Sequence, residues 1–383
     1  MKKKPVIIIR NAKSYDFGGG ERFPVFLAET LAKNEMTPIV VSRSKKLLDF
    51  ANDRSVPSVR GWWWSNQNWS GARVLLFPIY LLWQVVLFFW YLQLFIRKKP
   101  MAVHIQSKDD FIAATFAGKL AGARVIWTDH ADLKHIWLNV RTWYKNPVGK
   151  LVHFAARFAD AITMVSQSEK TLVTGHIKNT GVLNKIRVVY NGVEDESALY
   201  ADQNKEPDFT FCVASRLVTD KGINEVIEAF TMLQKNTPNV KLWLMGDGPE
   251  ADTFKDKTAG NEQIIFLGHQ KRPLEYMARA HVFVHPTYHE GFSVALVEAS
   301  MLGLPIIATS VGGNTEIIIN ETTGLLVPAK DSQALRRVMA RLYEDAKLRS
   351  KLGSSAREQY LGQFVFSNIV SSEFIPLYKG DLS

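Results

Sequence analysis

The stretch that decides the fold is His285 to Asn314, which reads HPTYHEGFSVALVEASMLGLPIIATSVGGN. The apolar residues 282–284 before it predict a buried parallel strand that ends at the following proline. A polar loop with Glu290 comes next, and a helical pattern that begins near Ser293 carries Glu298. Open α/β sheets bind ligands at the carboxyl ends of their strands, and the N–H groups at a helix start favour an anion such as phosphate. We therefore predict that the two glutamates flank one ligand, with a phosphate between them.

The spacing of Glu290 and Glu298 resembles the E-x7-E element of family-four retaining glycosyltransferases, which have the GT-B fold. The segment 302–318, LGLPIIATSVGGNTEII, extends the resemblance beyond the two glutamates. The resemblance implies that Glu290 orients the hydroxyl groups of a donor sugar and that Glu298 orients those of the donor ribose. It also implies donor contacts from the residues at the helix start, which are Gly291, Phe292, Ser293 and Val294.

Strand-like and helix-like segments alternate along both halves of the chain, which predicts parallel sheets covered by helices. The polar stretch 191–208 interrupts this alternation and predicts a linker between two domains. The predicted strands are 6–9, 38–42, 102–105, 124–128 and 161–165 in the first half, and 209–214, 241–245, 264–266, 282–285, 306–308 and 325–327 in the second.

Two such sheets in tandem, together with the E-x7-E element, favour an α/β fold of the GT-B type, with two Rossmann-like domains facing each other across a cleft. The expected limits are 1–195 for an N-terminal, acceptor-binding and membrane-associating domain, and 196–363 for a domain that binds the nucleotide sugar. The resemblance implies that residues 364–383 form a helix that packs back on the N-terminal domain.

The segment SRLVTDKG follows the predicted strand 209–214 and contains the cations Arg216 and Lys221. Two cations above a strand end can clamp a diphosphate, because each charged hydrogen bond contributes roughly 1.5–3 kcal/mol. The segment resembles the SR-x4-KG phosphate clamp of the same family. The resemblance implies that both side chains stabilise the departing diphosphate.

Four shorter pieces, at residues 18–22, 246–250, 267–269 and 311–316, each fit simple turn chemistry alone, but their order along the chain strengthens the resemblance. Adjacent glycines, including Gly19 and Gly20, let a backbone approach a ligand closely, and they fall where the family's GG-x-E loop touches the donor phosphate. The GDGPE loop that begins at Gly246 is similar to a loop that faces the nucleotide, and His269 follows a strand end where relatives contact the base. His130, in the WTDH segment, matches a strand-end histidine that faces the sugar and the acceptor.

The composition is that of a folded protein, with 46% hydrophobic and 22% charged residues. A single cysteine, Cys212, excludes an intramolecular disulfide and a cysteine-based metal cluster. His285 and His289 lie near Glu290 but are interpreted as hydrogen-bonded residues, so no metal site is predicted. We expect no cofactor besides a UDP- or GDP-linked sugar as co-substrate. Residues 1–5 lead straight into a strand, which predicts a cytoplasmic protein without a signal peptide.

Positive charge is concentrated in one half of the chain. Residues 1–200 contain 28 Lys and Arg against 15 Asp and Glu, whereas the remainder contains 19 against 22. A basic half favours nucleic acid, an anionic membrane surface or an anionic substrate as a partner. No basic helix or RNA-binding motif is present in the sequence, so we expect no nucleic-acid partner.

The segment 74–96 carries no charge and ends at Arg97-Lys98-Lys99, and tryptophans 62, 63, 64 and 69 precede it. A helix of this length could cross a bilayer core of roughly 30 Å. The predicted strands on either side belong to one sheet, however, and cannot lie on opposite sides of a membrane. We therefore expect residues 62–99 to bind an anionic membrane surface, with one or two helices in the cytoplasmic leaflet. A helix buried inside the protein is the alternative.

The leading hypothesis is a retaining glycosyltransferase that moves a hexose or N-acetylhexosamine from a nucleotide sugar to a lipid-linked or glycan acceptor at the membrane, in cell-envelope polysaccharide or glycolipid synthesis. It would be a peripheral or monotopic enzyme at the inner face of the cell membrane. A nucleotide-sugar epimerase or hydrolase of the same fold is the nearest alternative, and a non-catalytic lipid-binding module is a more distant one. The sequence does not identify the sugar, the nucleotide base or the acceptor.

Overall fold

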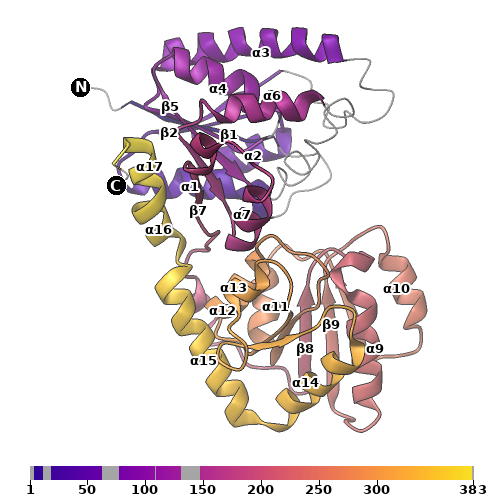
Figure 1. The fold of residues 1–383 in the computed structure, drawn as a ribbon. Coiled ribbons are helices and arrows are strands. Elements are labelled where there is room, and N and C mark those ends of the chain that lie inside the picture. Colours follow the sequence, from indigo (N-terminus) through magenta and orange to yellow (C-terminus); the bar gives the residue numbers. More distant parts are fainter. Residues whose placement is uncertain (1–3, 12–18, 63–76, 108, 131–146, 382–383) are drawn as a thin grey trace. The chain divides into compact units, whose positions relative to one another are not determined.

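The computed structural model describes residues 4–11, 19–62, 77–107, 109–130 and 147–381. The chain divides into two compact units: the first comprises Met1–Tyr190 with Ser367–Ser383, and the second Asn191–Phe366. Each unit is built on its own parallel sheet (Figure 1). The predicted α/β architecture with two Rossmann-like domains is confirmed. The domain limits predicted from the sequence, 195/196 and 363/364, lie a few residues from the boundaries of the units.

The sheet of the first unit has seven parallel strands in the order β3-β2-β1-β4-β5-β6-β7. Its inner strands are short runs rich in Val and Ile that are buried on both faces, as is typical of a parallel sheet. The strands are β1 (Val6–Ile9), β2 (Pro38–Ser42), β3 (Ser58–Arg60), β4 (Ala102–Ile105), β5 (Arg124–Asp129), β6 (Ala161–Met164) and β7 (Ile186–Val188). β3 and β7 were not predicted from the sequence.

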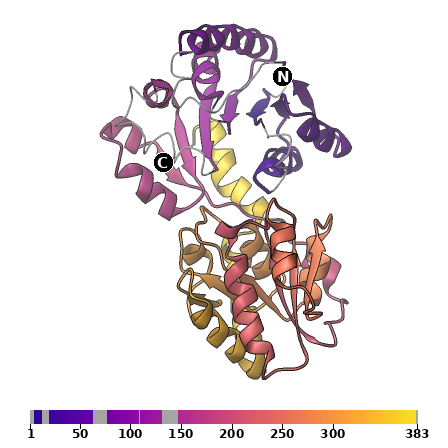
Figure 2. The same cartoon turned by 90° about the vertical axis from the view of Figure 1, so that its right-hand side faces the viewer.

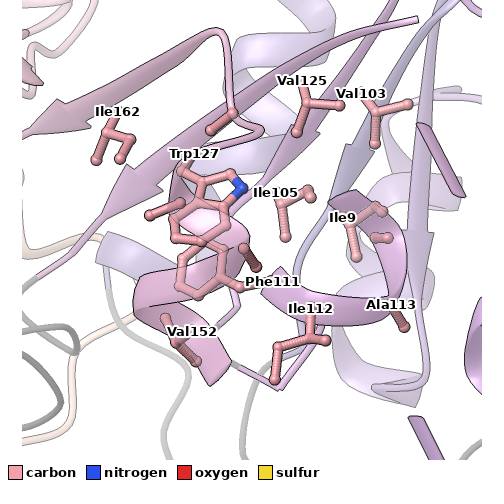
Figure 3. Packing of buried hydrophobic residues seen from close by; sticks show 14 of the residues in the cluster. Ile9, Val103, Ile105, Phe111, Ile112, Ala113, Val125, Trp127, Val152 and Ile162 are labelled. Atoms are coloured by element: carbon pink, nitrogen blue, oxygen red, sulfur yellow. The ribbon is translucent and has the colours of Figure 1, made fainter. Parts of the chain in front are cut away.

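The helices of the first unit that precede the linker are α1 (Gly19–Lys33), α2 (Lys45–Asp53), α3 (Phe77–Lys98), α4 (Phe111–Leu120), α6 (Pro147–Ala156), α7 (Gln167–Thr174) and α8 (Thr180–Leu183). One face of the sheet packs on α3, α4 and α6, and its core is seen in Figure 3. There Trp127 of β5 stacks on Phe111 of α4 with ring centroids 4.2 Å apart. The buried indole N–H of Trp127 donates to Thr115 Oγ1 at 2.8 Å, so this large side chain is both packed and satisfied.

The end of the chain completes the first unit on the other face of its sheet. It consists of α16 (Phe366–Ile369), the π-helical turn Val370–Phe374 and α17 (Ile375–Lys379), which lie beside the strands in Figures 1 and 2. Arg124 Nε donates to the carbonyl oxygen of Leu377 at 3.0 Å, and the Tyr378 hydroxyl lies 2.7 Å from His104 Nδ1 inside the sheet. The last segment is thus held by one buried and one partly buried hydrogen bond as well as by ring contacts.

Helix α3 is long and apolar enough to cross a membrane by length and composition alone. It runs along α4 (Figure 1) and buries one stripe of its surface, which consists of Tyr80, Gln84, Leu87, Tyr91 and Phe95. Large apolar side chains point outward instead, among them Ile79, Leu82, Val85, Phe89 and Ile96. The alternative of a helix fully enclosed by protein is therefore wrong. Residues 63, 64, 69 and 74–76, which the membrane prediction included, lie outside the described part of the chain.

The sheet of the second unit has six parallel strands in the order β10-β9-β8-β11-β12-β13. The strands are β8 (Phe209–Ala214), β9 (Val240–Met245), β10 (Ile264–Gly268), β11 (Val282–His285), β12 (Ile306–Thr309) and β13 (Leu325–Val327). The helices are the short 3₁₀ turns Ser197–Tyr200 and Thr219–Lys221, α9 (Ile223–Gln234), α10 (Ala251–Lys257), α11 (Pro273–Arg279), α12 (Val294–Met301), α13 (Asn314–Ile317), α14 (Ser332–Glu344) and α15 (Ala346–Gln363). β8 and β11 are neighbours, so the loops that follow them meet at one edge of the sheet.

Candidate functional site

The loop after β8 is shaped by a glycine that touches the loop after β11. The chain leaves β8 at Ala214 and forms the 3₁₀ turn that ends at Lys221. Gly222 then adopts a left-handed conformation with φ 69°, and a Cβ atom there would lie 2.0 Å from the carbonyl oxygen of Pro286. Only glycine fits such a contact. This close approach brings Lys221 to the loop that carries Glu290.

Lys221 and Glu290 form an ion pair at this edge. Lys221 Nζ donates to Glu290 Oε2 at 2.9 Å, and both side chains are less than one-fifth exposed. The buried His285, the last residue of β11, places its Nε2 3.3 Å from the same oxygen. Burial raises the pKa of Glu290, but the hydrogen bond from His285 and the charge of Lys221 outweigh it and lower the pKa to about 2. Glu290 is therefore a carboxylate throughout the physiological range.

Two adjacent glycines in the loop after β12, Gly312 and Gly313, contact the backbone of the loop that carries Glu290. The Gly313 N–H donates to the carbonyl oxygen of Glu290 at 3.1 Å. A Cβ atom at Gly312 would lie 1.9 Å from that same oxygen, and one at Gly313 would lie 2.2 Å from the carbonyl oxygen of Gly291. The loop after β12 thus packs directly on the loop that carries Glu290, which fixes the position of its carboxylate.

The start of α12 lies directly after this loop. Ser293 is its N-cap, and the Ser293 hydroxyl accepts the N–H of Leu296 at 3.3 Å. Phe292 is buried against Phe364, with ring centroids 5.8 Å apart. Val294 begins the helix, and both Gly291 and Glu298 are partly buried. The predicted order of loop, cap and helix is therefore present, with Glu290 before the helix and Glu298 within it.

The remaining donor-site candidates of the second unit lie at neighbouring strand ends. Arg216 follows β8 and is exposed, and His269 follows β10 and is also exposed. Gly246 follows β9 with φ 136°, and a Cβ atom there would lie 1.8 Å from the carbonyl oxygen of Ser215. The loops after β8 and β9 are therefore in contact, so the GDGPE loop supports the segment that carries Arg216.

The first unit contains the other three candidates. Gly19 and Gly20 are the first two residues of α1, which follows β1 along the chain. His130 follows β5, and Phe23 of α1 meets its ring edge-on with centroids 5.0 Å apart. The three residues belong to the same unit. In the part of the chain that the structure describes, they do not form one hydrogen-bonded cluster.

Three contacts of the site differ in how far the sequence indicated them. The ion pair of Lys221 with Glu290 could not be predicted, because both residues had been interpreted as facing a ligand rather than each other. The hydrogen bond from His285 agrees with its interpretation as a hydrogen-bonded histidine, but its partner was unknown. The contact of Gly312 with Glu290 could have been suspected, since paired glycines after a strand are typical of a close backbone approach.

Comparison with protein-family models covers most of the chain. Residues 197–359 match the model described as glycosyl transferases group 1, and residues 17–197 match the model of glycosyltransferase family 4. The two matches adjoin each other and correspond closely to the two units.

Curated relatives are about a quarter identical to the chain over the segments that align. The capsular polysaccharide biosynthesis glycosyltransferase CapM of Staphylococcus aureus is 27% identical over 220 residues, which is 56% of this chain and 57% of the relative. The N-acetyl-alpha-D-glucosaminyl L-malate synthase of Bacillus anthracis is 27% identical over 58% of this chain and 61% of the relative. The chain thus spans about three-fifths of the length of these relatives.

Solved structures extend the likeness in fold to the whole chain. A glycosyltransferase from Rickettsia africae superposes with a TM-score of 0.78 and 18% identity, covering 99% of both chains. The HepE protein of Anabaena, solved in complex with UDP, gives a TM-score of 0.76 and 19% identity over 99% of this chain and 100% of its own. With both family models matched and the two parallel sheets in place, the chain belongs to the group 1 glycosyltransferases of the GT-B fold.

Proposed function

We propose that the protein is a retaining glycosyltransferase that moves a hexose or N-acetylhexosamine from a nucleotide sugar to a membrane-associated lipid-linked or glycan acceptor. The reaction would belong to cell-envelope polysaccharide or glycolipid synthesis, in line with the names of several relatives. The single observation that carries the proposal is the cluster of Lys221, Glu290 and His285 at the carboxyl ends of β8 and β11.

The cluster has the charges that departure of a diphosphate requires. Lys221 uses one donor on Glu290, and its ammonium group has three. Arg216 follows the same strand and is exposed, so its guanidinium can reach a ligand above the sheet edge. Cations placed where negative charge develops stabilise the transition state, and removal of one such group typically costs about 2.7–4 kcal/mol. Arg216 and Lys221 are the groups we assign to the leaving diphosphate.

Glu290 is suited to hold the sugar rather than to attack it. Its low pKa keeps it an acceptor of hydrogen bonds from sugar hydroxyls, and His285 and Lys221 keep it in place. Retention through a covalent intermediate needs a second carboxylate about 5 Å from the first. We propose instead that leaving and attacking groups occupy one face of the sugar, and that the departing phosphate takes the proton of the acceptor hydroxyl. Glu298 would bind the ribose, and His130 would face the acceptor.

The donor is proposed to be a UDP- or GDP-linked sugar that binds without a metal ion. HepE has been solved with UDP and with UDP-glucose, which supports a uridine nucleotide by analogy. Arg216 and Lys221 would supply the positive charge that a divalent cation supplies elsewhere. The nucleotide would lie over the loops that carry Gly246 and His269, with the helix start at Gly291, Phe292, Ser293 and Val294 beside its phosphates. Gly19 and Gly20, at the start of α1, are assigned to contact with a donor phosphate because their loop resembles the family's GG-x-E loop.

The acceptor is proposed to reside in a membrane because of the outer face of α3. This face carries Leu82, Phe89 and Ile96, which are 69%, 61% and 58% exposed, while the polar Gln84 is turned inward. Gln93 is exposed on the same helix, but the outer surface of α3 is otherwise dominated by large apolar side chains, which fit a lipid environment rather than water. The helix ends in Arg97 and Lys98, and each cation near an anionic surface adds about 1 kcal/mol of binding. The protein would bind the cytoplasmic leaflet as a peripheral or monotopic enzyme.

The test is a product analysis with purified full-length protein. A panel of UDP- and GDP-linked hexoses and N-acetylhexosamines is supplied with and without polyprenyl-diphosphate-linked N-acetylglucosamine in phosphatidylglycerol vesicles. We expect donor turnover that rises with the lipid-linked sugar, and an NMR coupling that shows the donor's anomeric configuration in the product. Release of free sugar that is independent of acceptor would indicate a hydrolase, and a changed nucleotide sugar would indicate an epimerase. Vesicle binding without donor turnover would indicate a non-catalytic module.

A further inference from the structure

Two buried glutamines of the first unit differ in how their amides are satisfied. Gln84 on α3 is 6% exposed, and its Nε2 donates to the carbonyl oxygen of Asp109 at 3.2 Å while its Oε1 accepts the N–H of Ala113 at 3.2 Å. Gln106, directly after β4, is 2% exposed, and neither Nε2 nor Oε1 has a hydrogen-bond partner anywhere in the described structure. Burying an amide without hydrogen-bond partners lowers the stability of a protein. The two unpartnered amide atoms of Gln106, Nε2 and Oε1, therefore need an explanation.

The backbone of Gln106 is firmly placed even though its side chain is unpartnered. Its N–H donates to the carbonyl oxygen of Ile9 at 2.9 Å, and its own carbonyl oxygen accepts from Arg10 Nη1 at 2.5 Å. Ile9 pairs with Ile105 in the sheet, and Ile105 with Trp127. Side chains alternate along a strand, so Gln106 points away from the core around Trp127 and shares a face with His104, two residues earlier. The amide is therefore at the carboxyl edge of the sheet, on the face opposite α4.

A second unpartnered group lies at the same edge. Both ring nitrogens of His130 are buried and have no hydrogen-bond partner in the described structure. Burial lowers the pKa of His130 well below its usual value, and the charges of Arg10 and His104 lower it further. The ring is therefore neutral, with one nitrogen that donates and one that accepts. β4 and β5 are adjacent strands, so Gln106 and His130 follow neighbouring strand ends.

The chemistry of these two groups selects a type of ligand. An amide and a neutral imidazole each offer one donor side and one acceptor side, and a hydroxyl group can satisfy both at once. A phosphate only accepts hydrogen bonds, so it would leave Gln106 Oε1 and one nitrogen of His130 facing negative oxygen atoms. Arg10 lies at the same edge, where its Nη1 donates to the carbonyl oxygen of Gln106, and it leaves the acceptor sides of the amide and the imidazole without a donor.

We propose that Gln106, together with His130, binds hydroxyl groups of the acceptor sugar, so that the attacking group is a sugar hydroxyl and not a lipid phosphate. This inference rests on the function proposed above and names the acceptor class for the same reaction. The hydroxyl oxygen forms the new bond to the anomeric carbon while the bond from that carbon to the diphosphate oxygen breaks. The bonding pair leaves with the diphosphate, and the hydroxyl proton passes to it. Gln106 exchanges no proton and determines which acceptor is held.

The decisive experiment compares Gln106→Leu with Gln84→Leu, which removes a buried amide of the same kind whose partners are present. Thermal unfolding, donor hydrolysis and binding of methyl hexosides by saturation-transfer NMR are measured in full-length protein. Loss of an unsatisfied amide should leave the unfolding midpoint of Gln106→Leu unchanged or higher, whereas Gln84→Leu should unfold at a lower temperature. Hexoside binding should weaken about tenfold or more in Gln106→Leu and stay unchanged in Gln84→Leu. The reason is that Gln106→Leu removes both the donor and the acceptor that the amide would offer to a sugar hydroxyl.

Each other outcome decides the matter as well. Wild-type protein that binds no hexoside, or a Gln106→Leu variant that binds as tightly as wild type, overturns the inference. So does a variant that loses affinity for polyprenyl phosphate and keeps its affinity for hexosides. Donor hydrolysis separates failure of this inference from failure of the proposed function. A wild-type protein without donor turnover contradicts the proposed function itself. If the leucine variant does not fold, Gln106→Met has a flexible side chain of similar volume and is measured in its place.

Discussion

The carboxyl edges of the two sheets carry different kinds of polar group. In the second unit the edge is charged and internally paired, with Lys221 and His285 both bound to Glu290. In the first unit the edge at β4 and β5 also carries two neutral groups, the amide of Gln106 and the ring of His130, which have no partners among the described residues. The diphosphate is the same in every UDP- or GDP-linked sugar, so fixed charges are adequate for it. Acceptors differ in their hydroxyl groups, and neutral groups that await a partner can discriminate among them.

The largest effect is expected from breaking the charged edge. Lys221→Ala and Glu290→Ala should each lower transfer by about 10²–10³, because the leaving diphosphate loses its cation or the sugar loses its anchor. Both variants should stay folded, which circular dichroism and thermal unfolding will check. Lys255→Ala, which removes an exposed ion pair with Asp252, serves as the control. Wild-type turnover in either site variant would contradict the assignment.

The next effect concerns lipid binding, which only the first unit is expected to show. Replacing the exposed Leu82, Phe89 and Ile96 with Ser should release the protein from phosphatidylglycerol vesicles, since apolar burial contributes about 25 cal/mol per Å². High salt should weaken wild-type binding only in part, because screening leaves the apolar contribution intact. Cosedimentation measures both effects.

The choice of α3 residues follows from their packing. Trp83, Phe88 and Trp90 on the same helix pack partly against the core, so Ser at these positions would destabilise the unit. Leu199→Ser removes an equally exposed leucine from the second unit and should leave vesicle binding unchanged. Release by that control variant as well would show that the protein binds lipid through general hydrophobicity and not through α3.

The two edges should also lose stability in different pH ranges. The pKa of Glu290 is lowered from 4.5 to about 2, so its contribution is present above pH 4.5 and is lost as the pH falls toward 2. The pKa of His130 is lowered from 6.5, so the unfolded chain takes up a proton first and stability falls as soon as the pH drops below 6.5. The free energy of unfolding, measured with denaturant, should therefore fall less steeply with decreasing pH in the variants than in wild type. For Glu290→Gln this difference is expected below pH 4.5, and for His130→Asn below pH 6.5. If variant and wild type showed the same pH dependence of unfolding free energy in these ranges, the lowered pKa values of Glu290 and His130 would be contradicted.

The smallest effect is expected from metal removal. If Arg216 and Lys221 supply the charge for the departing diphosphate, donor turnover should be unchanged in excess EDTA. A loss of turnover that Mn²⁺ or Mg²⁺ restores would show that the charged edge is incomplete without a cation.

The architecture was predictable because both sheets consist largely of buried strands with a clear apolar pattern. The strands that escaped prediction, Ser58–Arg60 and Ile186–Val188, are three residues long and each contains an arginine, so their pattern is too short to detect. The motifs placed Arg216, Lys221 and Glu290 on the correct loops. Which of them pair with each other depends on how the loops after β8 and β11 approach, and that is set by a tertiary contact at Gly222.

Side-chain surroundings were the least predictable part of the molecule. The segment that became α3 is apolar on every side in the sequence, so its pattern did not show that Gln84 would be buried and Leu82 exposed. Gln106 had no signal at all, because a glutamine after a strand is ordinarily a solvated residue. Its burial results from the tertiary packing of the first unit.

The contribution of the last residues to the first unit has a consequence for synthesis of the protein. The hydrogen bond from Arg124 to Leu377 and the one between His104 and Tyr378 join the first half of the chain to the turn at residues 377 and 378. A ribosome makes residues 1–190 before the second unit, yet their sheet stays uncovered beside Phe23 and His104 until Phe374 has been made. The second unit, which is continuous in sequence, can fold while the nascent chain is still attached. Loss of residues 374–379 would therefore damage the unit that is built mainly from the first 190 residues.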